Sequence, residues 1–366
     1  MTLLESLQSE LVPQLPAWSA SGAVDASFWR VLAQHDTLGQ CRKAAPMREL
    51  CEVARTLVGA LGIGAAASYA INEIAVSLIM RVDPTRSELL QSAVRGELRA
   101  ALCITEAESG SDVAGIETRA LREDTTYCLR GSKQYIANAP LADSFVVACK
   151  TSGAPETSWR DISLVLVERS NRGLTIGPTL RKVGAELLPL ASVDLHDCLV
   201  DARAVLGSLG RGFVYLMEAL AFERLVVAAL ASEATSVLLE RTIARLHQRA
   251  VFGRPLADRQ VLRHALTRLH ARSRVVSSFV WMTIDAYDRK TCSDDDVLVA
   301  KLSATELFKE SAATCPQFFG AAGFAREEPV SLAFEDARWT AIAAGANELL
   351  FDVLSNRVFG SAVLGH

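Results

Sequence analysis

Two segments of this sequence hold residue types that can carry out chemistry. The first, residues 102–112, reads L-C-I-T-E-A-E-S-G-S-D and places small hydroxyl residues and a glycine after an apolar run. Such a loop lets backbone N–H groups and the hydroxyls of Thr105 and Ser111 approach a flat polar ligand. Because a Ser/Gly-rich turn after a strand usually has no role beyond the turn itself, the loop indicates a ligand site only in combination with other motifs.

The second is Glu223, which is followed directly by Arg224. At helical spacing its carboxylate falls on an apolar stripe, whose other members are Leu216, Leu220, Val227 and Leu230. Burial on such a stripe raises the pKa of a carboxyl group into the working range of a general base. The alternative is that Glu223 pairs with an arginine to seal a helix interface.

The composition favours a globular enzyme. The chain has 366 residues, of which 50% are hydrophobic and 22% charged, enough for two or three packed units. The net charge of −4 gives no reason to expect nucleic acid or an anionic membrane as partner. The N-terminal residues lack a basic stretch, so we expect no signal peptide, and the apolar segment between Arg55 and Glu73 is predicted to be a core helix.

The eight cysteines show no C-x-x-C spacing, and we expect them to be reduced and mostly buried, in a cytoplasmic protein. The six histidines show no metal-ligand spacing, so no metal is expected. No P-loop, G-x-S-x-G or strand-following G-x-G-x-x-G is present.

The order of periodicities predicts an α+β fold. Helical spacing dominates residues 1–100, with Asp25 as the cap of one helix, and returns over residues 213–249, 294–314 and after Gly345. Between them, short β-rich runs punctuated by Gly and Pro predict an antiparallel sheet. These runs cover residues 127–131, 144–149, 162–167, 174–176 and 193–195.

Five further motifs follow the polar loop in a fixed order: G-S-K-Q-Y-I-A-N-A from Gly131, E-R at Glu223, R-A-V-F-G from Arg249, Q-F-F-G-A-A-G-F from Gln317 and A-G-A-N-E from Ala344. Together they resemble the FAD-dependent acyl-CoA dehydrogenase superfamily over nearly the whole chain. The resemblance implies an N-terminal α-helical domain (1–100), a middle antiparallel β domain (101–203) and a C-terminal four-helix bundle (204–366). It also implies a homo-oligomer, at least a dimer, because Arg249 matches an arginine that reaches the FAD of a neighbouring subunit.

The resemblance assigns residues to FAD. Thr105 matches a threonine that contacts the flavin ring, and the aromatic-Ile-Thr triplet beside the ring reads Tyr135-Ile136-Ala137, so Ala137 lacks the hydroxyl. Ala321 replaces one glycine of the Gly-rich signature. The full cofactor set is Leu102, Cys103, Thr105, Gly110, Ser111, Tyr135, Ile136, Ala137, Arg249, Val251, Phe252, Gln260, Gln317, Phe318, Gly320, Ala321, Ala346 and Glu348.

The resemblance also locates the base. Most members of the family carry it as a Glu at the position of Ala344, and an alanine cannot take a proton. A minority, including isovaleryl-CoA and long-chain types, carries the Glu just before an Arg on the first long helix of the bundle, which matches Glu223. Substrate contacts are implied for Ser111, Arg224, Ala344 and Gly345.

Among branches of the family, the chain looks most like the acyl-carrier-protein (ACP) dehydrogenases of polyketide antibiotic biosynthesis, of the type that helps make hydroxymalonyl-ACP for the methoxymalonyl extender unit. Two alternatives stay open. One is α,β-dehydrogenation of a short or branched acyl-CoA with Glu223 as base, and the other is a flavin-binding scaffold without catalysis.

Overall fold

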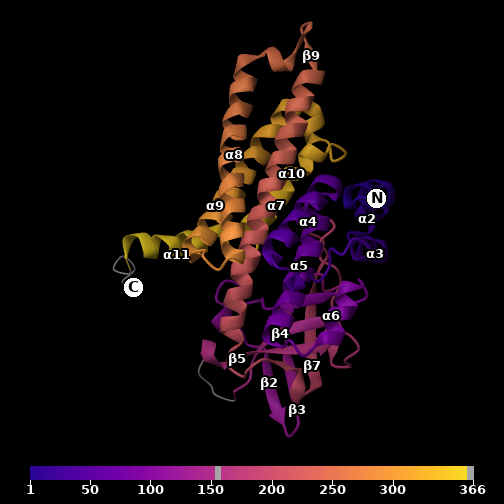
Figure 1. Cartoon of the computed structure of the whole chain (residues 1–366), viewed down its shortest axis with the longest axis vertical. Coiled ribbons are helices and arrows are strands. Elements are labelled where there is room, and N and C mark those ends of the chain that lie inside the picture. The colour runs from indigo at the N-terminus through magenta and orange to yellow at the C-terminus, as the bar shows by residue number, and fades with distance from the viewer. Residues whose placement is uncertain (153–157, 361–366) are drawn as a thin grey trace. The chain divides into compact units, whose positions relative to one another are not determined.

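A computed structural model describes residues 1–152 and 158–360 (Figure 1). Its contacts divide the chain into two compact units. The first unit contains residues 1–46, 67–182 and 186–222, and the second contains residues 47–66, 183–185 and 223 onward.

The N-terminal part of the chain is helical, as predicted. Asp25 caps α3 by accepting a hydrogen bond from the Ser27 N–H, and Phe28 lies buried on the inner face of this helix. α6 ends just before Gly96, which takes φ +71° and where the Cβ of any other residue would lie 2.7 Å from the Trp29 carbonyl oxygen. The helices are α1 (Leu3–Ser6), α2 (Leu15–Ser21), α3 (Ala26–Gln34), α4 (Pro46–Leu61), α5 (Ile63–Val82) and α6 (Ser87–Val94).

α5 is long and apolar enough to cross a membrane by length and composition, yet 83% of its apolar window is buried inside the protein. Its Tyr69 side chain, for example, is fully buried. This burial is typical of the core helix of a globular domain.

The first unit contains an eight-stranded sheet in the order β6-β7-β3-β2-β4-β5-β8, with β1 beside β4. Most neighbours are antiparallel, as predicted, but β1 and β2 both pair with β4 in parallel, so the sheet is mixed. The difference arises because β1 leads into a long loop instead of a hairpin. The strands are β1 (Ala100–Cys103), β2 (Arg119–Glu123), β3 (Thr126–Ala137), β4 (Ser144–Lys150), β5 (Ile162–Glu168), β6 (Leu174–Ile176), β7 (Leu190–Asp201) and β8 (Val205–Leu206).

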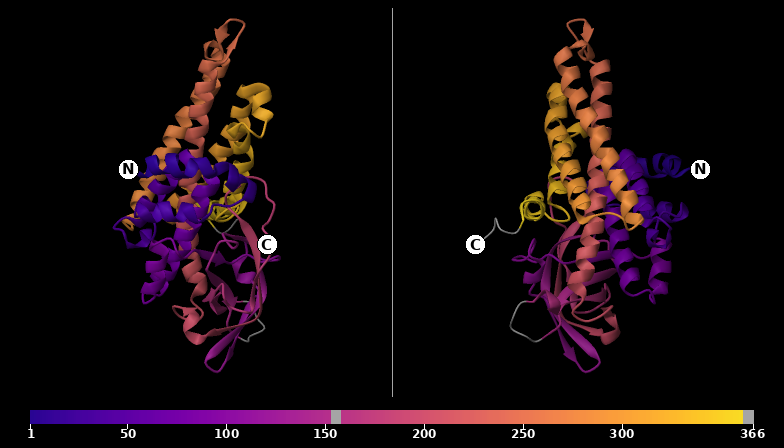
Figure 2. Two further views of the ribbon diagram at one scale, coloured as in Figure 1. Left: turned by 90° about the vertical axis from the view of Figure 1, so that its right-hand side faces the viewer. Right: turned by 60° about the vertical axis from the view of Figure 1, so that its left-hand side comes forward.

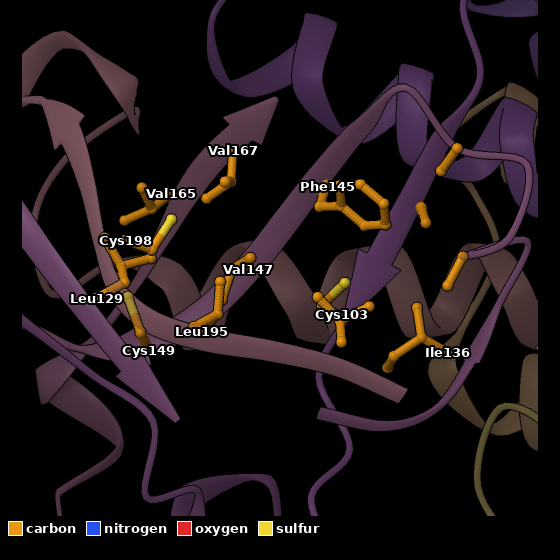
Figure 3. Close-up of a cluster of buried hydrophobic side chains, with 14 of the residues drawn as sticks. Cys103, Leu129, Ile136, Phe145, Val147, Cys149, Val165, Val167, Leu195 and Cys198 are labelled. Atoms are coloured by element: carbon orange, nitrogen blue, oxygen red, sulfur yellow. The ribbon is translucent and has the colours of Figure 1, made fainter. Parts of the chain in front are cut away.

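β4 is buried along its whole length because both faces of the sheet are covered. Phe145, Val147 and Cys149 join one apolar cluster, which Figure 3 shows with Cys103 and Leu195. Val146 and Ala148 belong to a second cluster, with side chains of α5 and the first turns of α7. All eight cysteines are free, and six of them are buried, as expected for small apolar side chains.

Long helices make up most of the second unit (Figures 1 and 2). α9 lies beside both α8 and α10, and the β9–β10 hairpin connects α7 to α8. The predicted helices at residues 213–249 and 294–314 are confirmed. The elements are α7 (Gly212–Gln248), β9 (Ala250–Val251), β10 (Arg254–Pro255), α8 (Gln260–Asp288), α9 (Asp294–Thr314), α10 (Pro329–Ile342) and α11 (Asn347–Phe359).

Candidate active site

In the first unit, the polar loop (residues 104–112) follows β1 and is tied to β3. The Gln134 N–H donates to the Thr105 carbonyl oxygen at 2.8 Å, and the Glu106 N–H donates to the Ser109 carbonyl oxygen at 2.8 Å. The Ser109 hydroxyl donates to the Asp112 carbonyl oxygen and so closes the loop on itself. Ser109 therefore has a structural role.

A buried ion pair beneath this loop was not predicted. Lys133 on β3 is fully buried, and its Nζ lies 2.7 Å from Oε1 of Glu106 and 3.0 Å from the Ile104 carbonyl oxygen. Glu106 also accepts hydrogen bonds from the Glu117 N–H and from the N–H and hydroxyl of Thr118. Burial acts to raise the pKa of Glu106, but the charge and hydrogen bond of Lys133, together with the hydrogen bonds from Thr118 and Glu117, outweigh burial and hold that pKa below its ordinary value.

The polar loop keeps hydrogen-bonding groups free for a ligand. Within residues 1–152 and 158–360, neither the N–H nor the hydroxyl of Thr105 or Ser111 has a hydrogen-bond partner. Ser111 and Gly110 are exposed, and Thr105 is half-buried. Unpaired donors at the end of a strand fit the carbonyl oxygens and nitrogens of a flavin ring. Leu102 and Cys103 lie on β1, where Cys103 is buried in the sheet core.

The Tyr135-Ile136-Ala137 triplet ends β3 in a bulge. The pairing of β3 with β7 shifts between Lys133 and Ile136, and Tyr135 takes φ +57°. Ile136 points into the sheet core (Figure 3), whereas the Tyr135 side chain is 63% exposed. A bulge of this kind re-aims a side chain. Here it presents an aromatic face on the segment that anchors the polar loop, which fits a flat ring, and Ala137 is half-buried.

In the second unit, Arg249 precedes a two-residue hairpin turn at Phe252 and Gly253, whose φ angles are +53° and +76°. Positive φ at both positions is what a tight hairpin turn requires. Arg249 is exposed and has no ion-pair partner within the described residues. Gln260 begins α8 and is exposed, while Val251 is half-buried. An unpaired guanidinium on a fixed turn fits a pyrophosphate.

The Gly-rich segment Cys315–Phe324 presents backbone and aromatic groups. Gly320 takes φ +61°, and a Cβ added there would meet no atom within 4 Å, while Gln317 and Ala321 are exposed. Phe318 is half-buried, and Phe324 is 95% exposed. Backbone that no side chain covers allows a nucleotide to approach closely.

Glu223 lies half-buried on α7, and Val227 and Leu230 of the predicted stripe are buried. Burial raises the pKa of Glu223 to about 7, against the opposing charges of Arg224 and Lys301. Among the described side chains, no cationic group forms an ion pair with its carboxylate. The alternative prediction, an ion pair between Glu223 and an arginine at a helix interface, is therefore not observed among these residues. A carboxylate with this pKa is half ionised near neutral pH and can accept a proton.

Arg224 binds the turn between α10 and α11. Its Nε donates to the Ala344 carbonyl oxygen at 3.1 Å. Ala344 is buried with φ +57°, and Gly345 follows with φ +99°. Ala346 is the N-cap of α11, and Glu348 is exposed in its first turn, where an acidic side chain suits the helix dipole.

Comparison with known proteins identifies the family of this chain. Family profiles of the acyl-CoA dehydrogenase middle domain and C-terminal domain match residues 101–198 and 210–359. The long-chain specific acyl-CoA dehydrogenase of Mus musculus is 33% identical over 263 residues, which are 72% of this chain and 61% of that protein. The chain thus spans less than two thirds of this relative.

Two further matches cover a larger share of the matched protein. Benzylmalonyl-CoA dehydrogenase of Aromatoleum aromaticum is 30% identical over 275 residues, 74% of this chain and 71% of that protein. The crystal structure of acyl-CoA dehydrogenase from Geobacillus kaustophilus has a TM-score of 0.92 at 29% identity, covering 97% of this chain and 95% of that one. These matches include the sheet and the C-terminal helices, and they show that the chain belongs to the acyl-CoA dehydrogenase family, whose cofactor is FAD.

Proposed function

We propose that this protein is an FAD-dependent enzyme that oxidises an acyl group held as a thioester, with Glu223 as the base. The observation that carries the proposal is the state of Glu223. Its carboxylate is half-buried, free of any ion-pair partner in the described chain, and burial raises its pKa to about 7. These are the properties of a general base that works at neutral pH.

The reaction removes two hydrogens from the acyl group. When bound, FAD supplies an acceptor for a hydride. Glu223 accepts the other hydrogen as a proton at its carboxylate, so the substrate loses one proton and one hydride and gains a double bond. The Arg224 guanidinium donates a hydrogen bond to the Ala344 carbonyl oxygen and forms no ion pair with Glu223. The Glu223 carboxylate is therefore available to accept a proton.

We assign the free donors of Thr105 and Ser111 and the exposed ring of Tyr135 to the flavin, and Ser111 also to the thioester arm. Arg249, Gln260 and Gln317 are assigned to the remainder of FAD. Exposed Arg249 and the 93% exposed Phe252 support the proposal that this hairpin meets a second copy, in at least a homodimer. The eight free cysteines favour the reducing cytoplasm.

A second candidate is oxidation of a hydroxyacyl group on ACP, in polyketide extender-unit biosynthesis. Ala344 supports it, because this buried position lacks the carboxylate that most relatives are expected to hold there. In that reaction the proton leaves a hydroxyl group and the hydride leaves the carbon that carries it. The product is a carbonyl group instead of a double bond.

The test is anaerobic titration of the purified yellow protein with isovaleryl-CoA and with glyceryl-ACP, following flavin absorbance. We expect one of the two to bleach the flavin, and E223Q to slow that bleaching by a factor of about 10² to 10⁴, the usual contribution of a general base. E218Q is the matched control, because Glu218 is exposed on the same helix, and it should bleach at the wild-type rate.

Bleaching by isovaleryl-CoA alone favours dehydrogenation of an acyl-CoA, and bleaching by glyceryl-ACP alone favours the extender-unit reaction. An E223Q variant that bleaches as fast as E218Q rules out Glu223 as base. Bound flavin that neither thioester nor longer acyl-CoA chains bleach would favour the scaffold alternative.

A further inference from the structure

Lys301 is a fully buried lysine in the middle of α9. Its ammonium group has three acceptors, one at the end of α10, one in the turn that follows and one at the start of α11. Its Nζ lies 2.9 Å from the Gly345 carbonyl oxygen, 3.3 Å from the Ala341 carbonyl oxygen and 2.6 Å from Oδ1 of Asn347. An ammonium group has three N–H donors, so these three acceptors satisfy all of its hydrogen-bonding capacity.

Asn347, the first residue of α11, completes the connection. Its Nδ2 donates to Oγ1 of Thr305 at 3.0 Å and to Oε1 of Glu306 at 2.5 Å. Both partners lie on α9, one turn beyond Lys301. The turn that contains Ala344 and Gly345 is thus fixed to α9 by Lys301 and Asn347, and to α7 by Arg224.

The charge of Lys301 is not neutralised by contact. No carboxylate in the described chain forms an ion pair with it, although Glu348, Glu306 and Glu223 act on it from α11, α9 and α7. Burial and, second, the charge of Arg224 lower the pKa of Lys301 to about 8, so the group is mostly cationic at pH 7. The charged groups that act on Glu223 are Arg224 and this lysine.

We propose that Lys301 is a positioning residue for the reaction: it fixes the turn that carries Ala344 and Gly345, and its charge favours the ionised form of Glu223. The second part rests on the proposed role of Glu223 as base. Arg224 supplies the same sign of charge from α7 and binds the adjacent carbonyl group, so the two cations act together on one turn and one carboxylate.

The proposal is tested on the holoenzyme by infrared pH titration of the Glu223 carboxyl group, identified as the band that E223Q lacks. K301M removes the donors and the charge, and K301Q keeps an N–H donor but removes the charge. Both should raise the Glu223 midpoint by roughly half a unit to one unit, as loss of a nearby cation at an intermediate dielectric predicts. K290M is the matched control, because Lys290 is an exposed lysine of the same unit.

Hydrogen exchange of peptides that span residues 341–350 should be faster in K301M than in K290M. An unchanged Glu223 midpoint in both Lys301 variants would overturn the electrostatic role, and unchanged exchange would overturn the positioning role. If K301M does not fold, K301Q and K301R decide the question, since K301R keeps the charge and should leave the midpoint near that of the wild type. These measurements need no substrate, so failure of Glu223 as base shows separately, in the E223Q bleaching rates.

Discussion

The Nε of Arg224 donates a hydrogen bond across 3.1 Å to the carbonyl oxygen of Ala344. Arg224 directly follows the proposed base Glu223. Its hydrogen bond therefore connects the base's helix to the turn at Ala344, where most relatives are expected to carry their catalytic glutamate. The second unit thus brings together the two backbone positions from which members of this family are expected to supply a carboxylate, and only one of them, Glu223, carries it.

A carboxylate moved to the turn should therefore replace Glu223 in part. In E223Q/A344E, we expect flavin reduction at least about tenfold faster than in E223Q, within the range that a general base contributes. Ala344 already takes φ +57°, so the backbone cost of this conformation is present before the substitution. The measurement is stopped-flow bleaching, and E223Q/A343E is the control. Equal rates in the two double variants would contradict the prediction.

Removing the unpaired guanidinium of Arg249 should weaken FAD binding. A charge-assisted hydrogen bond to a phosphate contributes about 1.5–3 kcal/mol, so R249A should lower FAD affinity about 10-fold to 100-fold. The measurement is fluorescence titration of the apoprotein with FAD. R254A is the control, because Arg254 is also exposed in this hairpin. The assignment fails if R254A weakens binding as much as R249A does.

Loss of Lys133 should destabilise the fold and the polar loop together. K133M leaves the Glu106 carboxylate buried without its cation, which costs about 3–5 kcal/mol. We expect a lower urea midpoint and less bound FAD per protein molecule. The double variant K133M/E106Q removes the unpaired charge but keeps an acceptor for the Glu117 and Thr118 donors, so it should recover most of the midpoint without recovering FAD. Recovery of both would show that the pair serves stability alone.

Buried Glu73 should make stability depend on pH. Burial raises its pKa to about 7 from the ordinary 4.5, although the Gln40 N–H donates to it at 2.7 Å. Between these pH values the folded protein holds a proton that the unfolded chain releases, so stability falls as pH rises from about 4.5 through 7. E73Q removes this loss and should be more stable than wild type at pH 8, by up to about 3 kcal/mol.

Urea unfolding at pH 5 and pH 8 checks this prediction. E88Q is the control, because Glu88 is exposed. The advantage of E73Q over wild type should be present at pH 8 and small at pH 5. An advantage of equal size at both pH values would mean that the carboxyl group does not titrate in this range.

The sequence by itself determined several of the helices and strands, because those depend on local periodicity and caps, but the expected segments did not include β2 (Arg119–Glu123) or α8 (Gln260–Asp288). Asp25 caps its helix as predicted, and the helix at residues 294–314 has the predicted bounds. The sequence also placed Glu223 on an apolar stripe, since a stripe needs only the helical repeat. The parallel pairing of β1 with β4 was missed, because strand order depends on contacts between residues 44 apart, as Ala100 and Ser144 are.

Only the tertiary structure decided the roles of the buried charges. In the sequence, Lys133 stands between Ser132 and Gln134, and Lys301 stands between Ala300 and Leu302. Neither set of neighbours shows which groups the lysine binds. Their partners, Glu106 and Asn347, are 27 and 46 residues away along the chain. Desolvation and hydrogen bonding depend on these distant neighbours, so the folded chain sets the ionisation of Glu223 and holds the turn at Ala344.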